Sequence, residues 1–361
     1  MHKTTIFFCG GGTGGHFFPL IEIKRGLENT LKNSQFFYFG SLRGIEKTKA
    51  FKDFDNSFML LKIYGFKRKI NLINILENLF LIPLVLVGVC KVFMKFIKHN
   101  PKLLIATGGY ASLIPLIVAK MTFTPYYIQE QNSYPGIVTR LFHKGAKKVF
   151  LGFENAENFL QSSLNTLVTG NPTRFKNHKI SQKKESPLKT LMIFGGSQGS
   201  QNINLTIEEM INKNTFKNFQ VFWIVGKNNF NKFEKYNSSS IKVYSFVDNI
   251  EEFYFKTDLI ISRAGAMTVS EIIDFQIPSI LIPLPSAAEN HQYFNAKFLE
   301  ERNCSMIINE ENLNSVILEN QINAIFSNER IIKSMKNNFS LLNKRNSIKL
   351  IIDTLIEDIN A

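Results

Sequence analysis

The stretch TTIFFCGGGTGGHFFP, residues 4–19, decides the fold of the first half of the chain. The apolar run Thr4–Cys9 is typical of a buried strand, and it leads through the glycine-rich segment Gly10–Gly15 into a helical pattern. A strand that turns through glycines into a helix points backbone N–H groups outward at the positive end of the helix dipole. Glycine is needed there because a Cβ would block the close approach of a ligand. The stretch therefore predicts an α/β domain with an anion-binding turn.

A second stretch of this kind, TLMIFGGSQGSQ at residues 190–201, restarts the pattern in the other half of the chain. Each glycine turn follows an apolar run, so each marks a strand end of the kind at which α/β sheets bind ligands. Two such turns in separate halves predict two phosphate-bearing ligands held on opposite sides of a cleft.

Strand-like runs alternate with helical segments along both halves, which is typical of parallel sheets with crossover helices. In the first half the runs are Thr4–Cys9, Gln35–Phe39, Leu103–Thr107, Tyr126–Gln129, Val149–Gly152 and Thr166–Val168. In the second half they are Leu191–Phe194, Val221–Val225, Ile241–Phe246, Leu259–Ser262 and Ser279–Pro283. The predicted fold class is α/β, with two domains built on parallel sheets.

The domain boundaries follow from a polar, basic segment, Arg174–Ser186, that has no apolar period. Residues 174–187 are therefore the predicted linker between an N-terminal domain at 1–173 and a C-terminal domain at 188–340. Residues 341–361 carry apolar side chains at helical spacing and predict an amphipathic helix packed on one of the domains.

The composition is that of a globular protein, with 44% apolar and 20% charged residues among 361. The formal net charge of +14 favours an anionic partner: nucleic acid, anionic lipid or a phosphorylated substrate. Abundant Phe, Lys, Asn and Ile are also expected from an AT-rich genome. Compositional drift toward Lys therefore explains part of the positive charge equally well. Three scattered cysteines in apolar runs predict buried thiols in a reducing cytosol. The first strand begins too early to leave room for a signal peptide.

The positive charge is concentrated between Lys62 and Lys98, where cations precede and follow the apolar run Leu79–Cys90. An apolar surface flanked by cations is what an anionic lipid leaflet attracts, so residues 62–98 predict membrane docking. The alternative is a buried crossover helix with a solvated cationic end. The apolar run is too short to span a bilayer and contains Pro83, so no transmembrane helix is predicted.

His16 is the candidate for acid–base chemistry in the first domain. It begins a helix directly after the first glycine turn, where it could serve as a general base; a capping or packing role is the alternative. No acidic residue follows the second strand at Gly40–Ser41, which argues against a NAD site. The six histidines are dispersed without metal-ligand spacing, so neither a metal centre nor a cofactor is predicted.

The second glycine turn allows two interpretations. Gly195–Gly199 matches the G-x-S-x-G nucleophile elbow, and Asp258 and His291 follow Ser197 in the order that hydrolases use. A serine hydrolase therefore stays open, although it leaves the first half of the chain unexplained. A serine in a glycine-rich loop is also a natural phosphate ligand.

A third turn of this kind, Arg263–Thr268, enters a helix in which Glu271 lies one turn along. Glu271 could accept hydrogen bonds from a ribose diol, or it could be an ordinary carboxylate favoured by the helix dipole. Other polar turns follow predicted strands at Gly108–Tyr110, Gln131–Asn132 and Gly170–Arg174. Arg174 is suited to bidentate phosphate binding.

Seven motifs in order resemble those of the peptidoglycan N-acetylglucosaminyltransferases of glycosyltransferase family 28. They are GGTGGHFFP, ATGGYASLIP, QEQNSYPG, GNPTR, GGSQGSQNIN, SRAGAMTVSE and ENHQYFNA, and they run from Gly10 to about Asn295. The resemblance implies a GT-B fold of two Rossmann-like domains, with the C-terminal helix crossing back to the first. It also implies inverting, metal-independent transfer of GlcNAc from UDP-GlcNAc to undecaprenyl-diphospho-MurNAc-pentapeptide (lipid I to lipid II). The enzyme would lie on the cytoplasmic face of the cell membrane and bind no nucleic acid.

The resemblance also implies a role for individual residues. His16 is the candidate base, and the residues implied to meet the donor sugar or the acceptor in the first domain are Thr13, Gly14, Gly15, Tyr110, Asn132 and Arg174. Those implied to bind the donor in the second domain are Ser197, Val247, Gly265, Ala266, Met267, Thr268, Glu271, His291, Gln292 and Asn295. Among them Ser197 and the Gly265–Thr268 turn would hold the diphosphate, and Glu271 the ribose. Val247 would line the uracil site, and Gln292 and Asn295 would read the sugar hydroxyls.

Two departures from the family pattern and two rival functions stay open. His291 stands where some family members have Gln, and the run Leu79–Cys90 is bulkier than the family resemblance leads us to expect. A glycolipid synthase that glycosylates diacylglycerol would share the donor motifs. A non-catalytic scaffold would bind UDP-GlcNAc at the membrane without turning it over.

Overall fold

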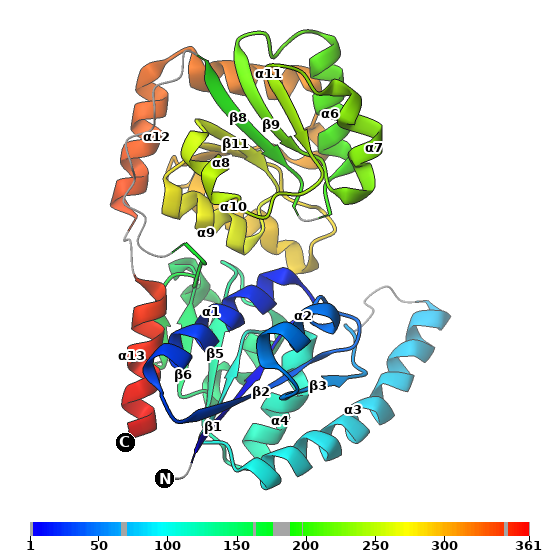
Figure 1. The fold of residues 1–361 in the computed structure, drawn as a ribbon, viewed down its shortest axis with the longest axis vertical. Coiled ribbons are helices and arrows are strands. Elements are labelled where there is room, and N and C mark those ends of the chain that lie inside the picture. Colours follow the sequence, from blue (N-terminus) through cyan, green and yellow to red (C-terminus); the bar gives the residue numbers. More distant parts are fainter. Residues whose placement is uncertain are drawn as a thin grey trace. The chain divides into compact units, whose positions relative to one another are not determined.

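The computed structural model divides the chain into two compact units (Figure 1). Unit 1 comprises Met1–Arg174 and Arg345–Ala361, and unit 2 comprises Phe175–Lys344. The structure describes residues 3–65, 71–161, 164–175, 188–196, 198–342 and 346–360. Most of the predicted linker therefore lies outside the described residues. Each unit is built on one parallel sheet, which confirms the predicted α/β fold class.

Unit 1 contains a seven-stranded parallel sheet in the order β3-β2-β1-β4-β5-β6-β7. Its strands are β1 Thr4–Cys9, β2 Ser34–Ser41, β3 Phe58–Leu61, β4 Leu103–Ala106, β5 Tyr126–Glu130, β6 Lys148–Leu151 and β7 Thr166–Val168. Its main helices are α1 Gly14–Thr30, α2 Glu46–Phe54, α3 Leu72–His99, α4 Leu113–Met121, α5 Ile137–Phe142 and α13 Ser347–Asn360. The strand order reverses between β1 and β4, and ligands of open α/β sheets bind at such a switch point. β3 was not predicted because four apolar residues do not distinguish a strand from a helix.

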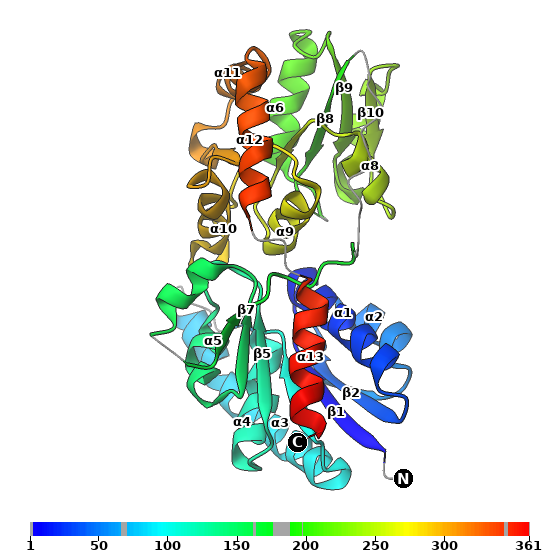
Figure 2. The same cartoon turned by 90° about the vertical axis from the view of Figure 1, so that its left-hand side faces the viewer.

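Side chains alternate across this sheet and build a core on each face. Ile6 and Phe8 of β1 pack with α1, α2 and α13, whereas Phe7 and Cys9 pack with α3 and α4. Figure 2 shows α1 and α13 on the opposite side of the sheet from α3 and α4. Because parallel strands are buried on both faces, β1 is a continuous apolar run without polar alternation.

Helix α13 belongs to unit 1 although it follows unit 2 in the sequence. It packs against α1 at Gly26, where an added Cβ would lie 2.8 Å from Cγ1 of Ile352. Ile351 and Leu355 are buried, and the Tyr127 hydroxyl of β5 donates a 2.5 Å hydrogen bond to Oδ2 of Asp358. The C-terminal helix therefore completes the core of the first unit.

Leu355→Ala should destabilise unit 1. Leu355 is 0% exposed, and truncating a buried leucine costs about 2–5 kcal/mol of unfolding free energy. Leu350→Ala on the same helix is the matched control, because Leu350 is 37% exposed and should cost less than about 1 kcal/mol. Urea unfolding of the full chain measures both changes. Equal losses in the two variants would contradict the packing of α13 through its Leu355 face.

Helix α3 overturns the expectation that no segment is long enough to span a membrane. The helix continues through Pro83. By length and composition alone, residues Ile73–His99 are long and apolar enough to cross a membrane, with a mean hydropathy of 2.2 in the most apolar window. Only 17% of that window is buried. One stripe of the helix, including Val92 and Phe96, packs into the core of unit 1. The opposite side exposes apolar side chains, among them Phe80, Ile82, Leu86, Val87, Met94 and Ile97.

The cysteines also depart in part from prediction. All three are free thiols, and Cys9 and Cys304 are buried as predicted. Burial raises the pKa of Cys9 to about 12 and that of Cys304 to about 11. Cys90 is exposed, because its position on α3 faces away from the core stripe. An apolar neighbourhood in the sequence was therefore not a sufficient sign of burial.

Unit 2 contains a six-stranded parallel sheet in the order β10-β9-β8-β11-β12-β13. Its strands are β8 Lys189–Phe194, β9 Phe219–Ile224, β10 Ile241–Tyr244, β11 Leu259–Ser262, β12 Ser279–Leu281 and β13 Ser305–Ile307. Its main helices are α6 Gln201–Asn212, α8 Glu251–Lys256, α9 Ala266–Phe275, α10 His291–Glu300, α11 Ser315–Phe326 and α12 Glu329–Leu341. The three-residue strand β13 was not predicted. The strand order reverses between β8 and β11, which places the second and third glycine turns side by side.

Candidate functional site

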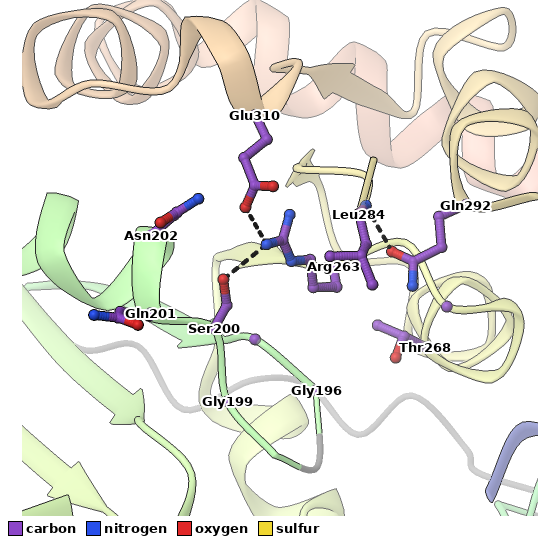
Figure 3. Close-up of a pocket in the computed structure, with 12 residues that line it drawn as sticks. Gly196, Gly199, Ser200, Gln201, Asn202, Arg263, Thr268, Leu284, Gln292 and Glu310 are labelled. Atoms are coloured by element: carbon purple, nitrogen blue, oxygen red, sulfur yellow. Dashed lines mark hydrogen bonds and ion pairs between the residues drawn. The ribbon is translucent and has the colours of Figure 1, made fainter. Parts of the chain in front are cut away.

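A pocket of about 400 Å³ lies at the switch point of unit 2 (Figure 3). The loop after β8 and the turn after β11 form its two walls, and its remaining lining comes from the loops after β12 and β13. The lining residues are Gly195, Gly196, Gly199, Ser200, Gln201, Asn202, Arg263, Gly265, Thr268, Leu284, Gln292 and Glu310. Of the predicted donor residues, Gly265, Thr268 and Gln292 therefore share one pocket.

Two helices begin at this pocket and make it attractive to anions. Helix α6 starts at Gln201 and is capped by the Ser200 hydroxyl, and α9 starts at Ala266 after Gly265 with no side-chain cap. The first N–H groups of α9 therefore have no partner within their own helix. Oriented N–H groups at the positive end of a helix dipole bind phosphate oxygens. The pocket suits a diphosphate on these grounds.

Arg263 is a central residue of the pocket that the sequence prediction did not include. Its guanidinium donates to the Ser200 hydroxyl at 2.8 Å, to the carbonyl of Ile282 at 3.1 Å and to that of Pro283 at 3.2 Å. It also forms an ion pair with Glu310, as Figure 3 shows. These contacts tie together the loops that follow four different strands. Arg263 therefore holds the walls of the pocket in place.

The glycine loop after β8 needs its glycines for packing as well as for ligand approach. Gly199 has φ +80°, and a Cβ there would lie 2.1 Å from the carbonyl oxygen of Val225. A Cβ on Gly195 would lie 2.2 Å from the amide nitrogen of Ser200. The loop is folded tightly against its own backbone at Gly195 and against the segment after β9 at Gly199, which leaves no room for a side chain at either position.

Gln292 faces the pocket with a donor group. Its Oε1 accepts a 3.0 Å hydrogen bond from the backbone N–H of Leu284, so the amide NH₂ is the group directed toward Thr268 (Figure 3). An NH₂ in that position can bind a sugar hydroxyl. Asn295 is fully buried instead, and it donates to the carbonyl of Ala264 below the turn.

The other predicted donor residues that the structure describes are not among the residues that line the pocket. Glu271 is half-buried one turn inside α9 and accepts a 2.7 Å hydrogen bond from the Tyr254 hydroxyl. Ala266 and Met267 form the first turn of α9, and Val247 is half-buried in the loop after β10. His291 Nδ1 lies 2.7 Å from the carbonyl of Ala288 at the start of α10.

The serine hydrolase interpretation fails on the position of its acid. Oδ2 of Asp258 accepts a hydrogen bond from the backbone N–H of Thr190, at the amino end of β8. Ser197 follows the carboxyl end of β8 and itself lies outside the described residues. Asp258 and the described start of the glycine loop, Gly195–Gly196, therefore lie at opposite ends of the strands of one parallel sheet, which does not suit a hydrolase triad.

In unit 1 the first glycine turn also leads into an uncapped helix. Thr13 is the N-cap of α1 and makes no side-chain cap hydrogen bond, so N–H groups at Gly14 and Gly15 have no helical partner. The N–H groups earlier in the loop are turned to partners within unit 1. Gly12 donates to the carboxylate of Glu46, and Gly10 donates to the carbonyl of Phe39.

Glu46 is a fully buried carboxylate that supports this first turn. Its Oε1 accepts from the backbone N–H of Ser41 at 2.8 Å and from that of Gly12 at 3.0 Å. Hydrogen bonds from backbone N–H groups to a buried carboxylate are strong because the acceptor is charged. Glu46 therefore fixes the path of the loop at Gly12, and the N–H groups at the start of α1 are the ones left to face a ligand.

His16 lies half-buried at the switch point between β1 and β4. Its Nδ1 is 2.9 Å from the carbonyl oxygen of Thr107 and 2.5 Å from Oε1 of Gln131. Gly108 and Gly109 have φ of +83° and +73°, and side chains there would approach the imidazole ring. The structure thus places His16 against the ends of β4 and β5.

The remaining predicted residues of unit 1 follow the carboxyl ends of β4, β5 and β7. The Tyr110 ring lies beside Gly12, where an added Cβ would come within 2.9 Å of it. Asn132 is held by Glu130, whose Oε1 accepts from both the backbone and the side-chain nitrogen of Asn132. Arg174 is exposed at the end of the unit 1 segment.

Four residues that organise these two sites were not among the predicted site residues, although Arg263 and Gln131 belong to turns that the sequence pointed out. Arg263 and Gln131 stand at strand ends, so their position was a usable signal. Glu46 and Glu310 gave no such signal, because each meets its partner only through the tertiary fold.

Among the residues that the structure describes, no group of three or more His, Cys, Asp or Glu side chains could hold a metal ion.

Family models match both halves of the chain. Residues 6–151 match the glycosyltransferase family 28 N-terminal domain, and residues 190–355 match the glycosyltransferase family 28 C-terminal domain. The Acinetobacter baumannii MurG crystal structure is similar, with a TM-score of 0.76 and 21% identity over 98% of this chain and 99% of that one. The Staphylococcus aureus MnaA–UDP structure has a TM-score of 0.66 at 14% identity. These likenesses confirm the predicted GT-B fold.

Curated relatives agree with the family models. A protein of Thermoanaerobacter sp. (strain X514) is 34% identical over 317 residues, which cover 83% of this chain and 85% of the relative. A protein of Carboxydothermus hydrogenoformans is 31% identical over 361 residues, covering 96% of this chain and 95% of the relative. Both are named UDP-N-acetylglucosamine–N-acetylmuramyl-(pentapeptide) pyrophosphoryl-undecaprenol N-acetylglucosamine transferase. The chain therefore belongs to glycosyltransferase family 28, as its motifs predicted.

Proposed function

We propose that this protein transfers GlcNAc from UDP-GlcNAc to undecaprenyl-diphospho-MurNAc-pentapeptide, with inversion at the anomeric carbon. The observation that carries the proposal is the pocket of unit 2, where two helix N-termini and Gln292 present donors suited to a diphosphate and a sugar. Relatives that are 33–34% identical and align with more than four-fifths of the chain carry the name of this activity.

In the proposed reaction unit 2 binds the donor. The N–H groups at the start of α9, together with Thr268, hold the diphosphate, and the Gln292 amide meets a sugar hydroxyl. Glu271 binds the ribose and Val247 lines the uracil site, as the family resemblance implies. Negative charge grows on UDP as the sugar–oxygen bond breaks, and preorganised donors stabilise it without a metal ion. Arg174 supplies a further cation.

Unit 1 supplies the acceptor side and the base. The N–H groups of residues 13–15, with Tyr110 and Asn132, meet the acceptor diphosphate or the donor sugar. His16 takes the proton of the acceptor hydroxyl through Nε2 while that oxygen attacks the anomeric carbon. The proton ends on His16, the new glycosidic bond replaces the bond to UDP, and the step is a single displacement.

The decisive test offers labelled UDP-GlcNAc with either lipid I or diacylglycerol, in the presence or absence of EDTA. We expect label in the lipid I product only, at the same rate with and without the chelator. Label in diacylglycerol alone would make the protein a glycolipid synthase. UDP-GlcNAc binding with no transfer to either lipid would make it a scaffold, and loss of transfer in EDTA would refute the metal-independent mechanism.

We also propose that α3 docks unit 1 on an anionic bilayer, as expected of an enzyme with a lipid-linked acceptor on the cytoplasmic face. Val92 and Phe96 pack in the core of unit 1, so lipid cannot surround the helix, and we infer that it lies on the membrane without crossing it. Lys91 and Lys98 are exposed toward the end of the same helix, where each cation adds about 1 kcal/mol near an anionic surface. The cations at residues 67–69 lie outside the described residues.

Leu86→Glu should weaken binding to vesicles that contain anionic phospholipid by at least about tenfold, because it removes a leucine from the lipid contact. Leu86 is 62% exposed on α3, and Val316→Glu is the matched control, since Val316 is 57% exposed on α11 of unit 2. Co-sedimentation at low and high salt measures both. Equal binding by the two variants would contradict docking through α3.

A further inference from the structure

We propose that Gln131 is a positioning residue that fixes His16 as the Nδ1–H tautomer, which leaves Nε2 to accept a proton. The inference rests on the proposed function, in which His16 is the base. It comes from buried amide side chains at the carboxyl ends of β5 and β7, which connect His16 and the Thr107 carbonyl after β4 to Asn171.

The orientation of the Gln131 amide follows from its surroundings. Its Nε2 lies 2.9 Å from the carbonyl oxygen of Thr107, 2.8 Å from that of Gln129 and 2.6 Å from Oε1 of Gln129. Three acceptors around this atom require the amide nitrogen there, so the amide oxygen faces His16. His16 Nδ1 then has two acceptors within 2.9 Å, Thr107 O and Gln131 Oε1, and must carry the hydrogen.

A further amide keeps this arrangement from reversing. Gln129 Nε2 donates to Oδ1 of Asn171 at 2.8 Å, and Asn171 Nδ2 donates back to the carbonyl of Gln131 at 2.9 Å. Gln129 and Gln131 are 0% and 1% exposed, so water cannot replace a lost partner. Turning one amide would set donor against donor in a buried network, at a cost of about 1–3 kcal/mol for each unmet group.

The other ring nitrogen of His16 is left for the substrate. Within the described part of the chain, both hydrogen bonds of the His16 ring are made by Nδ1 and none by Nε2. Gly109 borders that side of the ring, where an added Cβ would lie 3.1 Å from Cδ2 and 3.5 Å from Nε2. A neutral imidazole with hydrogen on Nδ1 has its lone pair on Nε2, which is the form a general base requires.

The ionisable groups nearest this network are turned to other partners. Glu46 binds Gly12, Glu130 binds Asn132 and Thr139, the Cys9 thiol hydrogen-bonds to Ser112, and the Tyr110 ring lies against Gly12. The group that orients His16 is therefore a neutral amide. A carboxylate at this place would also stabilise the imidazolium, whereas the amide sets the tautomer without adding a charge.

Nitrogen NMR of the full chain labelled with ¹⁵N-histidine tests the proposal directly. The His16 signals are identified by their absence in His16→Gln. We expect the Nδ1–H tautomer in the wild-type chain and a mixture, or the Nε2–H tautomer, in Gln131→Met. Observation of Nε2–H at His16 in the wild-type chain would overturn the proposal, and this measurement does not depend on how any Gln131 variant folds.

Kinetics supply a second readout that a purely structural role would not give. Gln131→Met should lower kcat about 10- to 100-fold and leave KM for UDP-GlcNAc within about twofold, because the wrong tautomer impairs only proton transfer. Tyr126→Phe is the control, since it removes a 2.9 Å hydrogen bond from the same strand to the carbonyl of Phe142, away from His16. An unchanged kcat in Gln131→Met, or an equal loss in Tyr126→Phe, would also overturn the proposal.

The two hypotheses fail in different ways. If the wild-type chain transfers no sugar to any lipid, the proposed function is wrong, while the tautomer spectrum still decides whether Gln131 positions His16. If transfer occurs but the tautomer is Nε2–H, the proposed function stands and only the positioning role is lost.

Discussion

His16→Ala should lower kcat by about 10³-fold, because the acceptor hydroxyl then has no base to take its proton. Binding of UDP-GlcNAc should persist, since the pocket with its two helix N-termini is built from unit 2 alone. The measurements are initial rates with lipid I at saturating donor, and UDP affinity by calorimetry. We expect the loss to appear in kcat at unchanged donor affinity.

His99→Gln is the matched control for this experiment. His99 is also in unit 1, at the end of α3, with its ring 6.1 Å from that of Phe7. Burial first, and the charges of Lys95 and Lys98 second, lower the pKa of His99, so its replacement by a neutral amide changes little. Near-normal turnover in His16→Ala would contradict the assignment of His16 as the base. An equal loss of kcat in His99→Gln would show that the loss is not specific to His16.

Gly199→Ala should abolish donor binding and destabilise unit 2. The backbone at Gly199 has φ +80°, which costs a residue with a side chain about 1–3 kcal/mol. The added Cβ would also lie 2.1 Å from the carbonyl oxygen of Val225, a backbone atom that cannot turn aside. The loop must therefore move, and with it Ser200, whose hydroxyl receives the Arg263 hydrogen bond. Donor affinity and urea unfolding together measure the loss.

Gly196→Ala in the same loop separates backbone strain from displacement. Gly196 has φ +88°, but an added Cβ would find no atom within 4 Å. We expect only the strain cost of about 1–3 kcal/mol and measurable donor binding. Weaker donor binding in Gly196→Ala than in Gly199→Ala would refute the view that tight packing of the loop shapes the pocket.

The local sequence determined the elements that carry the sites. The runs TTIFFC and LIIS are strands with the predicted bounds, because strands buried on both faces must be continuously apolar. The glycine turns after β1, β8 and β11 were predictable for two reasons. Glycine lets the backbone approach a ligand closely, and each turn leads into a helix whose N-terminus can bind an anion. The family motifs depend on these same short segments, which is why the fold and the family could be predicted from the sequence.

The tertiary structure alone decided which side chains meet at the switch points. Glu46 reaches Gly12, and Arg263 reaches Glu310, across distances in sequence that no local pattern spans. Likewise, the apolar pattern of α3 could not tell its packed stripe from its exposed side, since both are equally hydrophobic. Burial, hydrogen-bond partners and the tautomer of His16 depend on how strands far apart in sequence are ordered in the sheet, and spacing along the chain does not record that order.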